Sequence, residues 1–396
     1  MPLAQSQRRI LFSISAVIFL LYAAQGLLRP VLPRYIEFRT ETDAAAVVGL
    51  IVMLNWGAQA LLSVPSGSLS DRIGRRRIII IGGLTAAGGF ILLPAASSVI
   101  LIMVVYTIAG FGQGSYSTAT AAYPIDLARS GQTARAIGWT QASRQTALFA
   151  FGPALGGLLA SFLGFNFVFI LAAILAIAAV VLSIALLPKI NPTLTREKEK
   201  PKTSFGIRST LGNRIIIGAL VATFSLQYAN NVFASFLPLY AAGLSLAVIG
   251  ALFGFQGVMN MVGRPLVGEL SNRIKHRTAV IGIGMLLGSG GMFLLSLSLS
   301  FELLAASAVL VGLSTGIAIV LILLTIAEQA PRERRGFVIG FFNTSLYLGL
   351  GLGPAIQGLV IANFGFKVGF QSAAFVPLVG LVIFAILSRK RRDQKE

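Results

Sequence analysis

A short charged segment between two long apolar stretches constrains this chain more than any other feature. It runs from residue 67 to residue 77, GSLSDRIGRRR, and holds Asp71 and four arginines. The flanking stretches, near 46–69 and 78–97, are each long enough to cross a bilayer. A gap this short must be a tight turn at a membrane surface, and Gly74 lets the backbone reverse there.

The composition agrees with a membrane location. The chain has 396 residues, of which 56% are hydrophobic and 11% charged, whereas a soluble protein carries roughly a quarter charged residues. The net charge of +19 would suggest nucleic acid for a soluble chain. Here the basic residues lie in the gaps between apolar runs. We therefore expect lipid around the chain and no nucleic-acid partner.

Residues that usually bind metals are scarce. There is no cysteine and only one histidine, His276, which lies in a charged loop. These facts exclude disulfides and thiolate metal sites, so we expect neither a metal nor a cofactor. A proton gradient stays open as an energy source. The first apolar run, 10–28, is too long for the hydrophobic part of a signal peptide, and we interpret it as the first membrane helix.

Twelve apolar segments are long enough to span a membrane. They lie near residues 10–33, 46–69, 78–97, 99–125, 135–161, 165–188, 214–240, 246–270, 279–298, 302–328, 337–362 and 366–388. Short joints between them force antiparallel neighbours, and one long polar joint divides them six and six. We expect an all-α membrane protein with an N-terminal bundle (1–188), a cytoplasmic linker (189–213) and a C-terminal bundle with a basic tail (214–396).

The distribution of basic residues predicts the orientation. Of 32 Lys and Arg residues, only Arg34, Arg39 and Lys367 fall in the gaps that follow odd-numbered spans. Three more lie inside spans, and the rest lie in the N-terminus, the tail and the gaps that follow even-numbered spans. Because short basic loops stay cytoplasmic, we expect both termini and the linker in the cytoplasm of a multi-pass cell-membrane protein.

The two halves of the chain are a repeat. Several landmarks recur 201 residues later, and the Leu-Pro pair of the first span recurs 205 residues later. The matched landmarks are 67–73 with 268–274, 152–154 with 353–355, 164–165 with 365–366 and 32–33 with 237–238. Chance does not place several such matches in register, so we infer two copies of one six-helix unit.

The spacing in residues 67–77 resembles the loop signature of the major facilitator superfamily, G-x-x-x-D-R-x-G-R-R, and matches every fixed position. The resemblance covers essentially the whole chain. It implies twelve transmembrane helices in two pseudo-symmetric six-helix bundles, with a solute site between them at mid-depth. It further implies a monomeric transporter of a small-molecule solute that is not an enzyme.

Polar side chains inside the spans recur on single helix faces. Asn55, Gln59 and Ser63 follow one another at four-residue intervals, and a shift of 201 residues maps them onto Gln256, Asn260 and Arg264. We expect such faces to line a water-accessible cavity; the alternative is hydrogen bonding between helices. The candidate solute-binding residues are Gln25, Asn55, Gln59, Gln141, Arg144, Gln145, Gln227, Asn230, Gln256, Asn260, Arg264, Asn343 and Tyr347.

Arg144 is the strongest of these candidates for solute binding. It lies nine residues beyond Arg135, which places it roughly 13 Å deep at ~1.5 Å per residue. At that depth its side chain cannot reach water, so it needs an anionic partner, a cavity, or both. Arg264 lies about 9 Å deep by the same reasoning and can snorkel inward. Arg29 is close to the outer end of its span, where an interface anchor is the simplest interpretation.

Resemblance to the family implies that the charged loop gates the cytoplasmic side, with Asp71 accepting from the start of the eleventh span. Asp126, with Arg129 or Arg135, extends this network, although a plain surface ion cluster is the alternative for Asp126 and Glu328. The candidate gating residues are Gly67, Asp71, Arg72, Gly74, Arg75, Asp126, Arg135, Gly268, Asn272 and Arg273. Because Asn272 replaces the aspartate in the second copy, that latch should be weaker.

Two Gly-Pro pairs predict kinked helices that approach other helices closely. The first resembles the end of the superfamily's antiporter motif, with two of its upstream glycines replaced. The candidate kink residues are Gly152, Pro153, Gly156, Gly157, Gly353 and Pro354.

Three function classes remain open. Export of a drug or metabolite by alternating access is favoured by the Gly-Pro motif and by the short outer loops. None of the 13 acidic residues lies in the middle of a span, and Tyr106 stands where exporters of the superfamily often have arginine. Both departures weaken a standard drug/proton antiport. Uptake or exchange of an organic anion is the alternative within transport, and a membrane sensor or lipid flippase is the alternative outside it.

Overall fold

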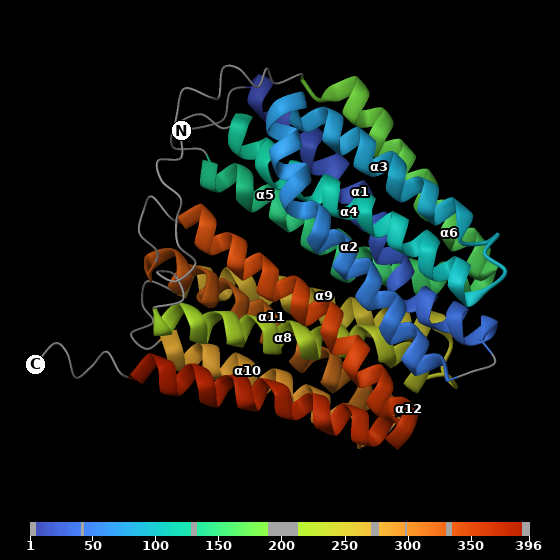
Figure 1. Cartoon of the computed structure of the whole chain (residues 1–396), viewed down its shortest axis with the longest axis vertical. Helices are drawn as coiled ribbons and strands as arrows, with labels where there is room; N and C mark the ends of the chain where they lie inside the picture. The colour runs from blue at the N-terminus through green and yellow to red at the C-terminus, as the bar shows by residue number, and fades with distance from the viewer. Residues whose placement is uncertain are drawn as a thin grey trace, which may run out of the picture. The chain divides into compact units, whose positions relative to one another are not determined.

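The computed structural model describes residues 5–40, 43–127, 133–188, 213–270, 277–297, 299–329 and 335–389, and within these ranges the chain is helical with no strand (Figure 1). The helices are α1 (Gln5–Arg39), α2 (Ala44–Ile73), α3 (Arg75–Leu92), α4 (Val99–Leu127), α5 (Thr133–Gln145), the π-helical segment η1 (Thr146–Phe151), α6 (Gly152–Leu186), α8 (Arg214–Tyr240), α9 (Leu246–Leu270), α10 (Arg277–Leu295), α11 (Phe301–Gln329) and α12 (Arg335–Arg389).

The described helices account for twelve membrane spans. Nine helical stretches of the described chain are long and apolar enough to cross a bilayer. Two of them, 51 and 49 residues long, turn back at Gly164 and Gly365, where φ is 81° in both cases. Each of these long stretches therefore holds two spans, and α3, with 18 residues, supplies the twelfth. The predicted fold class is confirmed.

The two turning glycines also confirm the internal repeat. Gly164 and Gly365 lie 201 residues apart and share φ values that side chains with a Cβ rarely adopt. The aromatic residues beside them repeat as well. Tyr35 packs edge-on against Phe169 with ring centroids 4.9 Å apart, and Tyr240 packs against Phe370 at 5.0 Å. The repeated sequence landmarks therefore specify the same packing twice.

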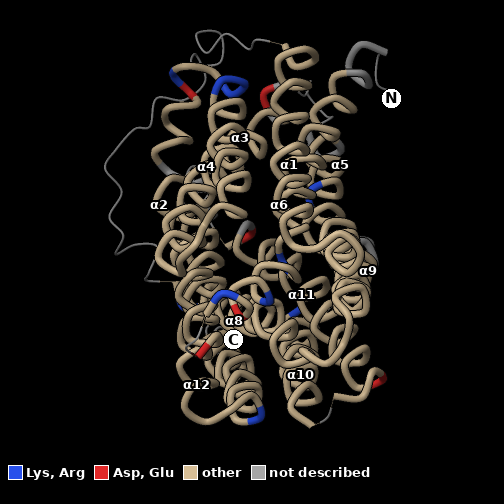
Figure 2. Tube along the Cα trace, turned by 90° about the vertical axis from the view of Figure 1, so that its right-hand side faces the viewer, with Lys and Arg blue, Asp and Glu red and all other residues tan. Residues whose placement is uncertain are grey.

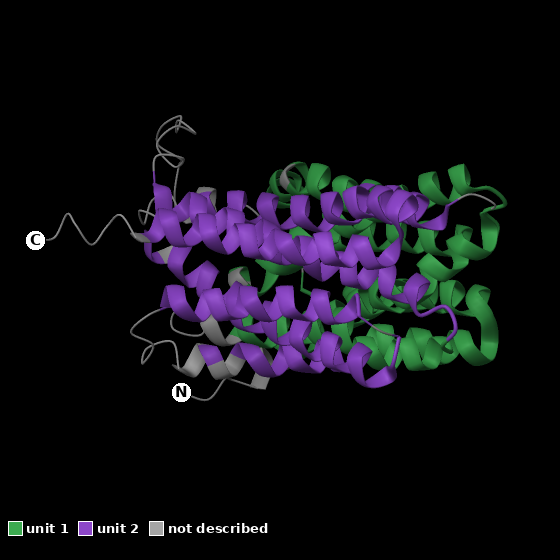
Figure 3. Cartoon of the chain, turned by 90° about the horizontal axis from the view of Figure 1, so that it is seen from below, with its two compact units in different colours: residues 1–40, 54–202, 244–254 green, residues 41–53, 203–243, 255–396 purple. Residues whose placement is uncertain are grey.

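The described chain forms two compact units (Figure 3). Unit 1 comprises residues 1–40, 54–202 and 244–254, and unit 2 comprises 41–53, 203–243 and 255–396. Unit 1 thus includes the start of α9, residues 246–254, where the Ala247 N–H donates to Ser161 Oγ of α6 at 2.7 Å. Unit 2 includes the start of α2, residues 44–53, where a Cβ at Gly49 would lie 2.3 Å from the Pro354 carbonyl oxygen.

This interleaving differs from a simple division of the chain into 1–188 and 214–396. A division at the linker assigns each helix to one repeat, whereas the compact units assign the first residues of α2 and of α9 separately from the rest of those helices. The linker itself lies outside the described residues up to position 212.

The surface of each unit is apolar. Large hydrophobic side chains such as Phe162 and Phe375 are 77% and 63% exposed, far more than a soluble protein tolerates in quantity. Long stretches of every described helix carry no charge, and charged residues gather mostly near helix ends (Figure 2). Hydrophobic side chains such as those of Ile216, Met285 and Phe384 fill the interior of unit 2. This inside-outside pattern is that of a membrane-spanning protein.

Candidate functional site

One face of α1 in unit 1 carries three polar side chains. Tyr22, Gln25 and Arg29 follow one another at three and four residues, so they lie along one stripe of the helix. From Leu21 to Pro33 every residue except Arg29 is buried. Between these two residues α1 is therefore enclosed, and Arg29 is the one residue that is not fully buried.

A chain of amide hydrogen bonds joins α1, α2 and α4. Gln25 Nε2 donates to Gln113 Oε1 at 3.1 Å, and Gln59 Nε2 donates to the same oxygen at 2.9 Å. Gln59 Nε2 also donates to Asn55 Oδ1, and Asn55 Nδ2 donates to the Tyr106 carbonyl, both at 2.8 Å. All four amide side chains are at most 5% exposed. In this conformation these residues hold helices together.

Gln113, the centre of this network, is not among the predicted site residues. It is the one amide in its span, and four positions later its face continues only with a hydroxyl residue, Ser117. The available signal was the pair Gly110 and Gly114. A Cβ at Gly114 would lie 2.6 Å from the Gln59 carbonyl oxygen, so glycine brings α4 against the α2 backbone and Gln113 within reach of Gln59.

Two arginines in unit 1 stack on aromatic rings, and together they flank η1. The Arg144 guanidinium carbon of α5 lies 4.7 Å from the Tyr22 ring centroid. The Arg29 guanidinium carbon of α1 lies 4.6 Å from the centroid of Phe149 and 5.9 Å from that of Phe253. Arg29 therefore packs inside unit 1, whereas the sequence suggested an interface anchor. Tyr106 of α4 interacts electrostatically with it.

Unit 2 contains related hydrogen bonds, but they do not form one connected chain. Asn260 Nδ2 donates to Thr315 Oγ1 at 2.6 Å, and Arg264 Nε donates to Asn260 Oδ1 at 3.0 Å. Gln256 Nε2 donates to Asn230 Oδ1 at 2.8 Å. The Asn260 bond repeats the Gln59 bond of unit 1, because glycines at 312 and 316 again bring the two helices together.

The other predicted residues differ in exposure. Gln227 is buried in α8, Gln141 and Asn343 are exposed, and Gln145 and Tyr347 are intermediate. The structure thus joins Gln25, Asn55 and Gln59 in unit 1. In unit 2 it joins Asn230 with Gln256, and Asn260 with Arg264, in two separate pairs.

The Gly152-Pro153 kink is preceded by a π-turn. Over η1 the backbone ladder shifts, and the Gly152 N–H donates to the carbonyl of Ala147, five residues earlier. Such a turn inserts an extra residue into the helix and is frequent at functional sites. Gly26 of α1 packs on it, since a Cβ there would lie 2.7 Å from the Ala147 oxygen.

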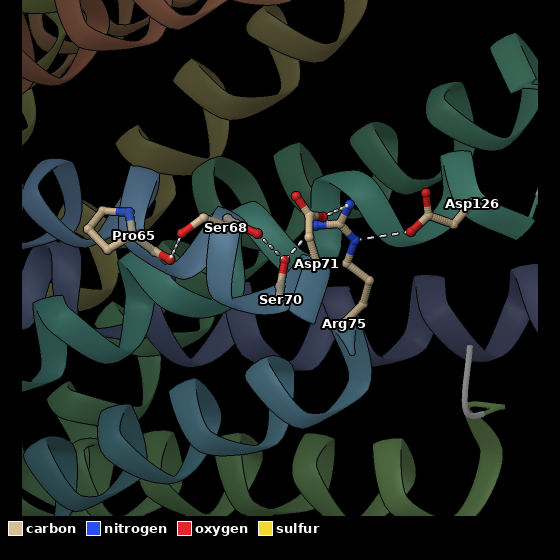
Figure 4. A network of polar contacts seen from close by, with 7 residues as sticks. Pro65, Ser68, Ser70, Asp71, Arg75 and Asp126 are labelled. Atoms are coloured by element: carbon tan, nitrogen blue, oxygen red, sulfur yellow. Dashed lines mark hydrogen bonds and ion pairs between the residues drawn. The ribbon is translucent and has the colours of Figure 1, made fainter. Parts of the chain in front are cut away.

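The charged loop is held by Arg75 (Figure 4). Its guanidinium pairs with Asp71 at 2.5 Å and with Asp126 at 3.0 Å, and it also donates to Ser70 Oγ. Gly74 turns the backbone with φ of 98°, as expected. Arg72 is exposed, and Gly67 is partly buried with open space beside it.

Several predicted gating residues cannot be placed. Asn272, Arg273 and Arg129 lie outside the described residues, as do the side chain of Arg135 and the surroundings of Gly268. The described partner of Asp126 is therefore Arg75. A second pair, Arg277 with Glu328 at 2.6 Å, stands 202 residues after Arg75 and Asp126, so the repeat carries this ion pair twice. Within the described chain no group of three or more acidic or histidine side chains could hold a metal.

Comparison with known proteins gives a consistent result. The sequence model of the Major Facilitator Superfamily matches residues 14–345 and 219–396. The Multidrug resistance protein MdtG of Escherichia fergusonii is 25% identical over 95% of this chain and 93% of its own length. The Multi-drug resistance efflux pump PmrA of Streptococcus pneumoniae is 26% identical over 93% and 94%. The crystal structure of the nucleoside transporter NupG matches with a TM-score of 0.81 at 13% identity, over 96% of this chain and 99% of that one.

Proposed function

Because the chain belongs to the major facilitator superfamily, and is therefore a membrane transporter and not an enzyme, we propose that it exports a small organic solute by alternating access. Export is supported by two relatives that are named as multidrug resistance proteins and that cover nearly the whole chain at 25% and 26% identity.

The observation that carries the proposal is the pair of arginines held inside the spans of unit 1. Arg29 and Arg144 are stacked on aromatic rings at 4.6 and 4.7 Å, in a part of the helix where an ionised group is costly. If these two positions served only to pack the helices, apolar residues there would cost less free energy than buried arginines. Such residues are expected where a polar solute is bound, and the amides of α1, α2 and α4 supply further donors and acceptors.

In this proposal the buried amide network is one of two arrangements. Bonds such as Gln59 to Gln113 close the polar face when no solute is present, and the solute exchanges for them during the cycle. In unit 2, the candidate residues on α9 and α12, including Arg264, Asn343 and Tyr347, are proposed to bind solute as well. Asp71, Arg75 and Asp126 gate the cytoplasmic side, with both termini cytoplasmic and the monomer as the working unit.

A stabilisation screen followed by transport measurements tests the proposal. The purified chain is melted with a panel of drugs, sugars and organic anions, and each stabilising compound is then followed in proteoliposomes. Export predicts accumulation in vesicles of inside-out orientation when a pH gradient is imposed. Transport that is unchanged after the gradient is collapsed would indicate a uniporter or exchanger, and absence of transport for every stabilising compound would indicate a sensor.

Uptake or exchange of an organic anion is the second candidate. It is favoured by the charge of the spans, because the described carboxylates of unit 1 all lie near helix ends while two arginines lie deeper. The two candidates differ in the vesicle orientation that accumulates the solute.

A further inference from the structure

We propose that Arg29 is the anchor for a carboxylate of the solute, and that the solute is a small aromatic carboxylate. This inference rests on the proposed function and adds the chemical class of the substrate. Arg29 is not among the residues that the sequence assigned to the site.

The first argument is an unmet hydrogen bond. Arg29 Nη2 is buried and has no hydrogen-bond partner among the described residues. A guanidinium presents five N–H donors, and a buried donor without an acceptor is costly. The Phe149 and Phe253 rings interact with the charge but offer no acceptor in the guanidinium plane. An acceptor from outside the chain can bind the N–H groups in that plane.

The second argument is charge. The described carboxylates of unit 1 are Glu37, Asp71 and Asp126, and each is already paired, with Arg34 or with Arg75. The described part of the unit therefore supplies no counter-ion for Arg29. A carboxylate fits best, because its two oxygens match the guanidinium fork and form two parallel charge-assisted bonds.

The third argument is access. Arg29 is the one residue of α1 between Leu21 and Pro33 that is not fully buried. Its side chain is thus partly accessible on a helix that is otherwise enclosed, although its Nη2 atom is buried. The groups around it include the rings of Phe149 and Phe253, which suit an aromatic skeleton better than a sugar or a polar amino acid.

The test compares 1-naphthoate with its neutral amide, 1-naphthamide, by thermal melting of the full chain in neutral detergent. The wild-type protein should bind the carboxylate at least about tenfold more tightly than the amide, as expected for a charge-assisted hydrogen bond. Arg29→Gln should remove this preference and leave the amide affinity unchanged. Arg29→Lys keeps the charge but not the fork, so it should keep only part of the preference. Arg34→Gln, on the same helix and paired with Glu37, is the matched control and should keep all of it.

Three results would overturn the assignment. These are equal binding of both compounds by the wild-type protein, an unchanged preference in Arg29→Gln or Arg29→Lys, and stabilisation by anionic phospholipid without any by naphthoate, which would assign the guanidinium to a lipid headgroup. Melting does not depend on transport. If Arg29→Gln loses the preference while wild-type vesicles move no solute, the anion site stands and the transport proposal fails. If wild-type vesicles move solute while Arg29→Gln keeps the preference, the transport proposal stands and the anion site fails.

Discussion

Pro153 and Pro354 occupy equivalent places in the two copies, yet their helices accommodate them differently. Proline has no N–H, so the carbonyl four residues earlier loses its helical partner. In the first copy the backbone shifts to a π-turn over Thr146–Phe151. In the second copy the described helix stays α-helical, and the side chain of Asn231 donates to the carbonyl of Leu350, the one that Pro354 leaves without a partner.

The residue that faces each proline helix decides which solution is used. Gly26 and Asn231 are equivalent, being 205 residues apart like the Leu-Pro landmarks of their spans. Glycine lets the α1 backbone lie directly on the π-turn, whereas asparagine fills the same place and supplies the missing donor. We therefore expect the residue on the neighbouring helix, Gly26 or Asn231, to determine whether the proline helix contains a π-turn.

The largest expected effect on stability comes from replacing Gly26 of the first copy by asparagine, the residue at the equivalent position of the second copy. In Gly26→Asn the new Cβ would lie 2.7 Å from the Ala147 oxygen and 3.1 Å from the Leu148 oxygen. Both are backbone atoms that cannot move aside, so we expect a loss of about 3 kcal/mol in unfolding free energy, the upper end for overpacking. Denaturant titration in detergent measures it. Gly88→Asn, where a Cβ meets nothing within 4 Å, is the control, and equal stability of the two variants would contradict the comparison.

The second effect comes from removing the donor of the second copy. Asn231→Leu leaves the Leu350 carbonyl buried without a partner, and we expect a loss of about 1–2 kcal/mol in unfolding free energy. Asn363→Leu is a matched control, because that exposed amide donates to Leu359 of its own helix at 2.8 Å. If both variants are equally stable, the Asn231 bond does not compensate for the proline.

A double-mutant cycle sharpens this assignment. Pro354→Ala restores an N–H that can donate to Leu350, which matters more when Asn231 is absent. The stabilisation by Pro354→Ala should therefore be about 1 kcal/mol greater in an Asn231→Ala background than in the wild type. Additive effects of the two substitutions would show that the side chain and the proline act independently.

The smallest effect concerns the ion pair that both copies share. Side chains of Arg75 and Asp126 are 18% and 16% exposed, whereas those of Arg277 and Glu328 are 28% and 57% exposed. Asp126→Asn should cost about 1 kcal/mol in unfolding free energy, because Arg75 keeps Asp71, and Glu328→Gln should cost less than about 0.5 kcal/mol. Thermal melting at low and high salt checks which substitution costs more stability. Salt should reduce the effect of Glu328→Gln more than that of Asp126→Asn. A larger effect of Glu328→Gln would reverse the comparison.

The sequence predicted the twelve spans and the repeat, because apolar run length and matched landmarks determine them directly. It did not predict Gln113 as a network centre, since its helix face continues only with a serine, Ser117, which is a weaker signal than a second amide. Arg29 was misplaced because distance along the chain does not reveal the aromatic rings of η1 and α9. The sequence also did not predict the π-turn. The Gly-Pro pair is the same in both copies, and the residue that differs is on another helix, Gly26 in the first copy and Asn231 in the second.

The two glycine turns offer matched attachment points for spectroscopic reporters. Asn166 and Lys367 each follow their turning glycine by two residues, and both are exposed. Because the chain contains no cysteine, the double variant Asn166→Cys, Lys367→Cys would take up spin labels at these two sites alone. The separation of the labels would then follow one end of each copy through the working cycle, with no background signal to subtract.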